Sequence, residues 1–580
     1  MSSASRPPTP ETPIQTIETD VLVVGGGVSG SLAVIGAAES GARVVVCDKG
    51  GRLERAGSVA GGVDHFFAVL EEGPEWDTPE YLLRYVPSIA DGITDIDVAE
   101  VLVRGLKDMV RRLESMGVDF HDPEAPDVTG YHRHRVFGLP GEYTINFDGA
   151  NFKHIIGRDA RRSGAKVLER TMVTDILMEK DRPVGALAFN IRTGEFYLIH
   201  SRAIILATGD INRLSKNASG HPFDSWHLPY NTGDGQVMAL RAGAQLANME
   251  FVESTISPKG YSSQGLNAFM GGGAHLINRL GERFMYKYHP SGELARRADL
   301  IHGVVTETLE GRGPIYIDCT HLPPEESQRL VDTLGIDRPA MPAFFKQKDI
   351  DLTKEPFEIT VSEMSIRRGG VYFRGCGIHI DPEGSSSIPG IYAAGDCSSM
   401  SAGIAGASVM GLTAGQHAGR FALSQPKPKP LSDEASMRLR NALYRPMTME
   451  EGILSSAFED QIRSIVTDHI GYRREENRMR EGLQKLQTLK GQEAEMVASD
   501  YHGVMRINEA CNLRYAAEAM AVSAIERRES RSGAAHVRVD FPEPNNETGL
   551  RMITVEQVGD ELQISSTPTG LSPERPSETT

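Results

Sequence analysis

Residues 20–50 contain a nearly complete nucleotide-binding unit. The apolar run Val21–Val24 predicts a buried parallel strand, and the turn after it spaces its glycines as Gly25, Gly27 and Gly30. In such a turn the first glycine permits the tight bend, the second lets the backbone approach a pyrophosphate, and the third lets the next helix lie close to the strand. The pattern therefore predicts a strand–turn–helix site for a dinucleotide.

The residues that follow complete this unit. Residues 31–40 predict the helix, whose free amides would face the phosphates, and residues 43–47 predict a second strand that delivers Asp48. A carboxylate about 20 residues after the turn accepts hydrogen bonds from the adenosine ribose hydroxyls, and Lys49 adds a charge beside it. A glycine-rich turn that binds nothing is the alternative, but strand, turn, helix, strand and acid in register favour a nucleotide.

A second group of motifs, far downstream, indicates which dinucleotide it is. Residues 388–396 predict a turn, a short strand and Asp396, and small residues dominate 398–415. In two-dinucleotide-binding flavoproteins such an acid meets the ribityl and phosphate part of FAD, and the next helix points its positive end at the flavin ring. Residues 203–209 resemble the strand-to-turn element that covers the cofactor. The combination predicts FAD.

Length, charge and cysteine usage exclude several classes. A chain of 580 residues suggests two or three domains, and its net charge of −17 argues against nucleic acid and anionic membrane surfaces as partners. The five cysteines are scattered without CxxC spacing, which argues against a metal or iron–sulfur site in this chain and favours the cytoplasm. We see no apolar run of the roughly 20 residues that a membrane span needs.

The motifs occur in an order that resembles the flavoprotein subunits of the fumarate reductase and succinate dehydrogenase superfamily, over nearly the whole folded length. They are Ala207-Thr-Gly209, Thr232-Gly-Asp-Gly235, Gly281-Glu-Arg-Phe-Met285, Ile391-Tyr-Ala-Ala-Gly-Asp396, and Arg528-Glu-Ser-Arg531 with His536 and Asp540-Phe-Pro542. Carried over residue by residue, the resemblance implies FAD contacts from Gly25, Gly27, Ser29, Gly30, Asp48, Lys49, Ser58, Gly61, Gly62, Val173, Ala207, Thr208, Gly209, Asp234, Gly395, Asp396, Ser408 and Val409.

The resemblance also implies an α/β architecture: a Rossmann-like two-dinucleotide-binding FAD domain with an inserted α+β capping domain and a C-terminal helical domain. We expect a flexible tail without an export signal (1–18), the FAD domain (19–244 and 356–425), the cap (245–355), the helical domain (432–545), a hairpin (546–566) and a disordered tail (567–580).

Several departures from the respiratory enzymes predict a different substrate. The four positions whose side chains clamp a dicarboxylate there fall at Ser257, Met270, Tyr372 and near Gly403. A buried dicarboxylate without its partners would cost several kcal/mol per ion, so we expect neither succinate nor fumarate to be the substrate. The histidine that binds FAD covalently is also missing, and His65 lies beyond its position, so FAD should be non-covalent.

Residues 55–62 and Gly311-Arg-Gly-Pro-Ile-Tyr316 look closer to the adenylylsulfate reductase α-subunit branch. That branch works with a small ferredoxin-like iron–sulfur subunit, which implies a similar electron partner here.

Two residues are candidates for proton transfer. Tyr372 falls where the family has a substrate-contacting histidine, although a packed aromatic residue with a satisfied hydroxyl is equally consistent. Arg374 would share a strand face with Tyr372 if this segment is a strand. Glu363, Arg367 and Arg368 are expected in a solvated turn instead.

The hypothesis from the sequence is an FAD-dependent oxidoreductase that moves a hydride or an electron pair between the flavin and an organic or sulfur-containing substrate under the cap. One alternative is an adenylylsulfate reductase α-like subunit with a ferredoxin-like partner. Another is a flavin electron-transfer or scaffold subunit that has no substrate of its own. Substrate identity, reaction direction and oligomeric state stay open.

Overall fold

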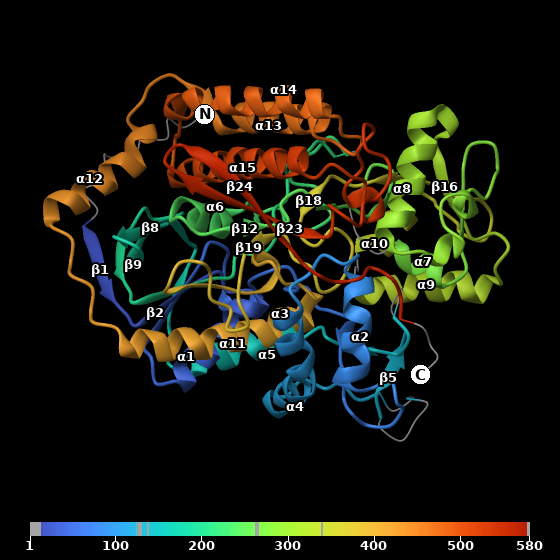
Figure 1. Ribbon diagram of the computed structural model, residues 1–580, viewed down its shortest axis with the longest axis horizontal. Helices are drawn as coiled ribbons and strands as arrows, with labels where there is room; N and C mark the ends of the chain where they lie inside the picture. Colours follow the sequence, from blue (N-terminus) through green and yellow to red (C-terminus); the bar gives the residue numbers. More distant parts are fainter. Residues whose placement is uncertain are drawn as a thin grey trace.

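The fold is described from a computed structural model, for residues 13–122, 125, 130–135, 139–217, 219–261, 266–337 and 340–576 (Figure 1). Its centre is a five-stranded parallel sheet in the order β20 (Ile391–Ala393), β11 (Ala203–Leu206), β2 (Val21–Val24), β3 (Val44–Asp48) and β7 (Lys166–Glu169). The middle strands β2 and β11 are buried along their whole length, as parallel strands covered on both faces must be.

Helices α1 (Val28–Glu39) and α11 (Gly403–Ser424) run side by side against this sheet (Figure 1). A Cβ atom on Gly411 would lie 2.4 Å from the Ser29 carbonyl oxygen, and one on Gly415 would lie 2.3 Å from that of Ala33. The small residues predicted at 398–415 therefore serve the close approach of the two helices, because no side chain fits between them at these points.

A second sheet corrects the predicted N-terminal tail. Its order is β1 (Ile14–Glu18), β10 (Phe196–His200), β9 (Arg182–Asn190) and β8 (Thr171–Glu179). Strand β1 pairs in parallel with β10 from Ile14 opposite Phe196 to Glu18 opposite His200. The tail prediction is therefore wrong for 14–18, where β-branched residues suit an edge strand. Residues 1–12 lie outside the described residues.

The inserted segment forms its own sheet and core. The antiparallel order is β14 (Ile256–Pro258), β17 (Phe357–Val361), β16 (Ile315–Asp318) and β15 (His275–Ile277). A hydrophobic cluster that includes Phe269, Phe345 and Phe357 is separate from the main core. Because β17 completes this sheet, the cap extends beyond the predicted boundary at residue 355.

Three helices near the C-terminus stack in Figure 1: α13 (Ser455–His469), α14 (Glu476–Leu489) and α15 (Tyr501–Glu526). Helix α14 matches the amphipathic pattern of residues 475–490, with Met479, Leu486 and Leu489 buried.

The predicted C-terminal hairpin is present as β23 (Arg551–Val558) and β24 (Glu561–Pro568), and it joins β12 (Leu246–Ala247) and β19 (Gly377–Ile378) in one sheet. The Thr569 hydroxyl then donates to the Gly92 carbonyl at 2.7 Å. The predicted disordered tail is therefore wrong at its start, because residues 567–569 are paired. Residues 577–580 lie outside the described part of the chain.

The remaining helices are α2 (Pro79–Ile89), α3 (Ile96–Arg104), α4 (Leu106–Met116), α5 (Phe152–Arg162), α6 (Asp234–Arg241), α7 (Asn267–Gly271), α8 (Arg297–Glu307), α9 (Pro324–Asp337), α10 (Ala340–Gln347) and α12 (Asp433–Tyr444). The remaining strands are β4 (His65–Phe67), β5 (His132–His134), β6 (Thr144–Asn146), β13 (Val252–Glu253), β18 (Ser365–Ile366), β21 (Ile453–Leu454) and β22 (Met496–Val497). Within the described ranges, no helix combines the length and apolarity that crossing a membrane requires.

Candidate functional site

A cavity of about 340 Å³ lies at the carboxyl ends of the parallel strands. Open α/β sheets bind their ligands at this edge. Most of the predicted cofactor residues line it, although they come from segments far apart in sequence: Gly25, Gly27, Ser29, Asp48, Lys49, Ser58, Val173, Ala207, Thr208, Gly209, Asp234 and Asp396. The fold therefore brings the early and the late motifs to one site.

The glycine turn after β2 has the geometry of a phosphate cradle. Gly25 has a φ of +96°, and a Cβ on Gly30 would lie 1.9 Å from the Gly25 carbonyl oxygen. At Gly27 the nearest atom to an added Cβ is 3.8 Å away, so the space beside this residue belongs to the cavity. Helix α1 begins there without a side-chain cap or an acidic residue in its first turn, which leaves its amides free for an anion.

Asp48 is fixed in place at the end of β3. Its Oδ2 accepts a hydrogen bond from the Gly26 amide at 2.7 Å, and its Oδ1 accepts one from the Gly50 amide at 2.8 Å. Each carboxylate oxygen can accept a further bond. The residue lines the cavity and can therefore meet a ribose hydroxyl without rearranging.

Lys49 differs from its expected role as a charge for the cofactor. Its Nζ donates to Asp234 Oδ2 at 2.6 Å, to Glu509 Oε1 at 2.9 Å and to Thr232 Oγ1 at 3.1 Å. Burial lowers the pKa of Lys49, but the two carboxylates outweigh it and raise that pKa. The lysine charge is balanced within the protein, where it joins β3 to α6 and α15.

Glu509 is the centre of this buried network. It is fully enclosed, and its Oε2 accepts from Arg213 Nη2 at 2.9 Å and from Arg506. Burial raises the pKa of Glu509, but Lys49, Arg213 and Arg506 together lower it to about 2. Helix α15 is therefore tied to the cavity wall by a largely buried network of charges.

Some predicted cofactor residues do not line the cavity. Gly30 lies beneath the turn, a Cβ on Gly395 would meet the Ser29 hydroxyl at 2.7 Å, and Ser408 donates to the Ile404 carbonyl within α11. The face of α11 toward the cavity instead carries Gly403, Ile404 and Ala407. The predicted residues absent from the lining are Gly30, Gly61, Gly62, Gly395, Ser408 and Val409.

Three arginines lie close to two acids beside the first residue of α11. We call this group the arginine cluster: Arg297, Arg367, Arg368, Glu253 and Asp396. Arg297 Nη1 lies 2.7 Å from Glu253 Oε1, and Arg368 Nε lies 3.3 Å from Glu253 Oε2. Arg367 lines the cavity, and its Nε donates to Asp396 Oδ2 at 2.7 Å. With both acids ionised, these five residues carry one excess positive charge, which the nearby buried carboxylate of Asp210 partly offsets.

In the described part of the chain, one fully buried donor of the arginine cluster is unused. Arg368 is 8% exposed, and its Nη1 is buried without a hydrogen-bond partner in the described part of the chain. Its guanidinium lies 4.7 Å from the Tyr372 ring centroid, and a Cβ on Gly403 would lie 3.9 Å from Nη1. Buried donors are nearly always paired in proteins, so this one is an exception, although Arg368 itself is not among the residues that line the cavity.

Comparison with known families shows which family the chain belongs to. Residues 20–411 match the family described as FAD binding domain, and residues 459–579 match the one described as Fumarate reductase flavoprotein C-term. The chain belongs to this FAD-binding flavoprotein family. Its members are FAD-dependent oxidoreductases, and the cradle, Asp48 and the free amides of α1 fit FAD as the cofactor of this chain.

Known proteins align with this chain over almost its whole length. The chain is 26% identical to a subunit of the fumarate reductase (CoM/CoB) of Methanothermobacter marburgensis, over 91% of this chain and 96% of the relative. It is 28% identical to an L-aspartate oxidase of Streptomyces coelicolor, over 93% and 91%. The structure of adenylylsulfate reductase from Archaeoglobus fulgidus superposes with a TM-score of 0.85 at 24% identity, over 97% and 98%. That likeness concerns the fold.

The structure corrects the prediction for Arg374. Residues 371–376 are not a strand, and Phe373 has a φ of +62°. Arg374 is fully buried, donates to Ser532 Oγ at 3.0 Å and to the Arg368 carbonyl at 3.3 Å, and lies 3.8 Å from the Phe251 ring centroid. Burial lowers the pKa of Arg374 to about 10. Arg374 therefore has a structural position and does not face the flavin cavity.

Tyr372 stays a prediction. Its ring lies beside Arg368 and stacks on Phe67 with centroids 5.5 Å apart, but it does not line the cavity.

Sequence reasoning missed Arg367 and Arg368 by placing them in a solvated turn. Both are buried because distant acids supply the opposite charge: Asp396 pairs with Arg367, and Glu253, 115 residues before Arg368, pairs with Arg368. The local signal was the pair of glycines that follows, since Gly369 and Gly370 have φ values of +64° and +74° and turn the backbone sharply. The sequence around residues 367 and 368 gives no sign that Glu253 is the partner of Arg368.

FAD should leave this protein when the protein is denatured. The segment 55–60 lines the cavity without a histidine, and His65 contacts Asp64 instead, with Nδ1 2.5 Å from Oδ1. We expect the visible flavin spectrum to appear in the supernatant after acid precipitation. Flavin that stays in the pellet would contradict non-covalent binding and would direct attention to His227, a histidine that does line the cavity.

Proposed function

We propose that this flavoprotein oxidises or reduces a small organic or sulfur-containing anion, other than succinate or fumarate, that binds between the arginine cluster and the flavin. The observation that carries the proposal is the buried, unused Nη1 donor of Arg368 beside Tyr372 and Gly403. FAD, when bound, supplies the acceptor or donor of a hydride or an electron pair.

The charge balance supports a substrate with a single excess negative charge. Glu253 already neutralises part of the cluster, and burial raises its pKa while Arg368, Arg367 and Arg297 lower it to about 2. One excess positive charge favours one unpaired anionic group, because a second buried anion without a partner costs several kcal/mol. This condition disfavours succinate and fumarate.

Each group of the site has a separate role in this proposal. Arg368 holds an oxyanion through a charge-assisted hydrogen bond. Arg367 positions Asp396, whose Oδ1 also accepts from Ser401. Tyr372 is the candidate proton donor to the substrate.

The proposal predicts the effect of Arg368→Gln. The charge-assisted hydrogen bond contributes about 1.5–3 kcal/mol, so kcat/KM should fall roughly 10- to 150-fold while FAD content stays unchanged. Substrates are found first by anaerobic bleaching or reoxidation of the flavin with anions and their neutral amides. The control is Arg192→Gln, on the exposed turn between β9 and β10. Equal reactivity of neutral amides, or ordinary turnover of succinate or fumarate, would overturn the proposal.

L-Aspartate belongs in that screen as a separate case. The relatives include an L-aspartate oxidase that is 28% identical, and L-aspartate carries a single net negative charge at neutral pH, unlike succinate. Flavin bleaching by L-aspartate would identify L-aspartate as a substrate, in agreement with the proposal.

Adenylylsulfate is the alternative candidate, but it carries two negative charges and is therefore disfavoured by the same charge balance. A ferredoxin-like electron partner and a location in the cytoplasm belong to this proposal, supported by cysteines that are all unpaired. A protein whose flavin reacts with no anion except in a complex would instead favour the electron-transfer role.

A further inference from the structure

A second cavity, of about 660 Å³, lies where the cap meets the C-terminal segments. Its wall is formed by α8 and the residue before it, by 472–473 ahead of α14, by parts of 530–546, and by Asp91 and Pro573. Over the described ranges, it shares no lining residue with the flavin cavity. Its volume is that of a small-molecule site, so it can bind a ligand independently of the flavin.

The lining of this cavity is rich in arginine, although the protein as a whole is acidic. Its lining contains Arg296, Arg473, Arg531 and Arg538, and Asp91 is the one acidic residue among the lining residues that the structure describes. The chain as a whole carries a net charge of −17. Arg296, Arg531 and Arg538 each pair with an acidic residue, so Arg473 supplies the positive charge of the lining that is left for an anion.

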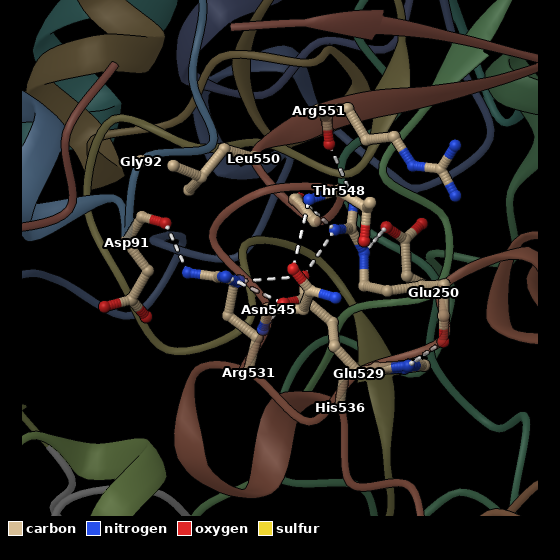
Figure 2. Close-up of polar contacts among 12 residues, drawn as sticks. Asp91, Gly92, Glu250, Glu529, Arg531, His536, Asn545, Thr548, Leu550 and Arg551 are labelled. Carbon is tan, nitrogen blue, oxygen red and sulfur yellow. Dashed lines mark hydrogen bonds and ion pairs between the residues drawn. The ribbon is translucent and has the colours of Figure 1, made fainter. Parts of the chain in front are cut away.

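Most of these arginines are held rigidly by the protein. Figure 2 shows Arg531 between Glu529 and Asp91: its Nε and Nη2 donate to Glu529 at 2.8 and 2.7 Å, and its Nη1 donates to the Asp91 carbonyl at 3.2 Å. Arg296 is held by Asp91 at 2.7 Å and by Asp299 at 2.9 Å. The wall is therefore preorganised.

Two side chains of the lining that carry nitrogen donors have no such partner in the described part of the chain. Arg473 and His302 make no hydrogen bond or ion pair within the described ranges, and they come from different elements. Burial lowers the pKa of His302; Asp299 opposes this effect and Arg473 adds to it, and the net lowering keeps the imidazole neutral near pH 7. Arg473 can then supply charge and His302 a neutral hydrogen bond.

The rest of the wall is largely apolar. Its members are Val305, Ala534, Val537, Val539, Pro542 and Pro544. An inorganic ion would leave this surface uncovered, whereas an organic body would bury it.

We propose that this second cavity is a binding site for an amphipathic organic anion. The oxyanion contacts Arg473 and His302, and the apolar body covers the valine and proline wall. The site goes beyond the proposed redox function, because it involves neither the flavin cavity nor the arginine cluster.

The test is isothermal titration calorimetry of the FAD-loaded chain with 8-anilinonaphthalene-1-sulfonate. N-phenyl-1-naphthylamine, which lacks the sulfonate, is the matched neutral probe. We expect one sulfonate probe per chain, with at least about tenfold weaker binding of the neutral probe and a similar loss in Arg473→Gln. Arg473 is exposed, so this variant should fold normally.

Arg420→Gln is the control, because Arg420 is an exposed arginine of α11 outside the cavity lining. Its affinity for the probe should equal that of the wild type. Equal binding of the neutral probe, unchanged binding in Arg473→Gln, or no binding of the sulfonate probe would each overturn the proposal.

Discussion

A Gly30→Ala substitution should disrupt the nucleotide domain itself, whereas Gly27→Ala should remove only its ability to bind FAD tightly. The Cβ at residue 30 would lie 1.9 Å from the Gly25 carbonyl oxygen, and helix α1 cannot move away without leaving the sheet and α11. Overpacking of this severity should lower the free energy of unfolding by about 3 kcal/mol or more.

Gly27→Ala is the informative counterpart. Gly27 has a φ of −60° and a ψ of −160°, which other residues adopt, and its added Cβ would meet no protein atom closer than 3.8 Å in the described part of the chain. The methyl group would occupy space that the FAD pyrophosphate needs. Urea unfolding of the FAD-free proteins measures the loss of stability, and titration with FAD measures the loss of cofactor binding. Equal destabilisation by both variants would show that the turn does not distinguish packing from binding.

Glu509→Gln should be the most destabilising change in the charged network. It would leave Lys49, Arg213 and Arg506 buried with one negative charge fewer, and breaking a buried ion pair costs about 3–5 kcal/mol. FAD affinity should fall as well, since Lys49 lines the cavity. Chemical denaturation of the variant against Glu495→Gln, an exposed glutamate, measures the effect.

The pH dependence of this loss has a defined sign. The folded-state pKa of Glu509 is about 2, below the ordinary value of 4.5, so ionised Glu509 stabilises the fold. Its contribution is complete above about pH 5 and is lost as the pH falls through 4.5 toward 2. The difference between wild type and Glu509→Gln should therefore shrink on acidification. A difference that stays constant from pH 7 to pH 3 would contradict the assignment.

The parts of this molecule that sequence predicted correctly have local signals. Strand β2, Gly25 and Asp48 follow one another within a short segment, and strand period, turn chemistry and spacing all agree there. The hairpin of β23 and β24 shows the same local alternation around Gly559.

The errors involve residues whose partners are distant. Arg368 pairs with Glu253, so it is buried only because another part of the chain neutralises it. A single sequence does not reveal such pairs, and an arginine next to glycines is then assigned to a solvated turn. The same limit hid β1, whose pairing with β10 cannot be recognised from residues 14–18 alone.

The strands of the parallel sheet are far apart in the sequence, so this sheet can be completed only late in synthesis on the ribosome. Strand β2 is made first, but β20, two places from it in the same sheet, follows only at residue 391, and α11 ends at residue 424. At about 5–20 residues per second, roughly 20 to 80 seconds pass before that sheet can close. The cap, with its own core, emerges whole during this interval and can fold while the nascent nucleotide domain still waits for its last strand.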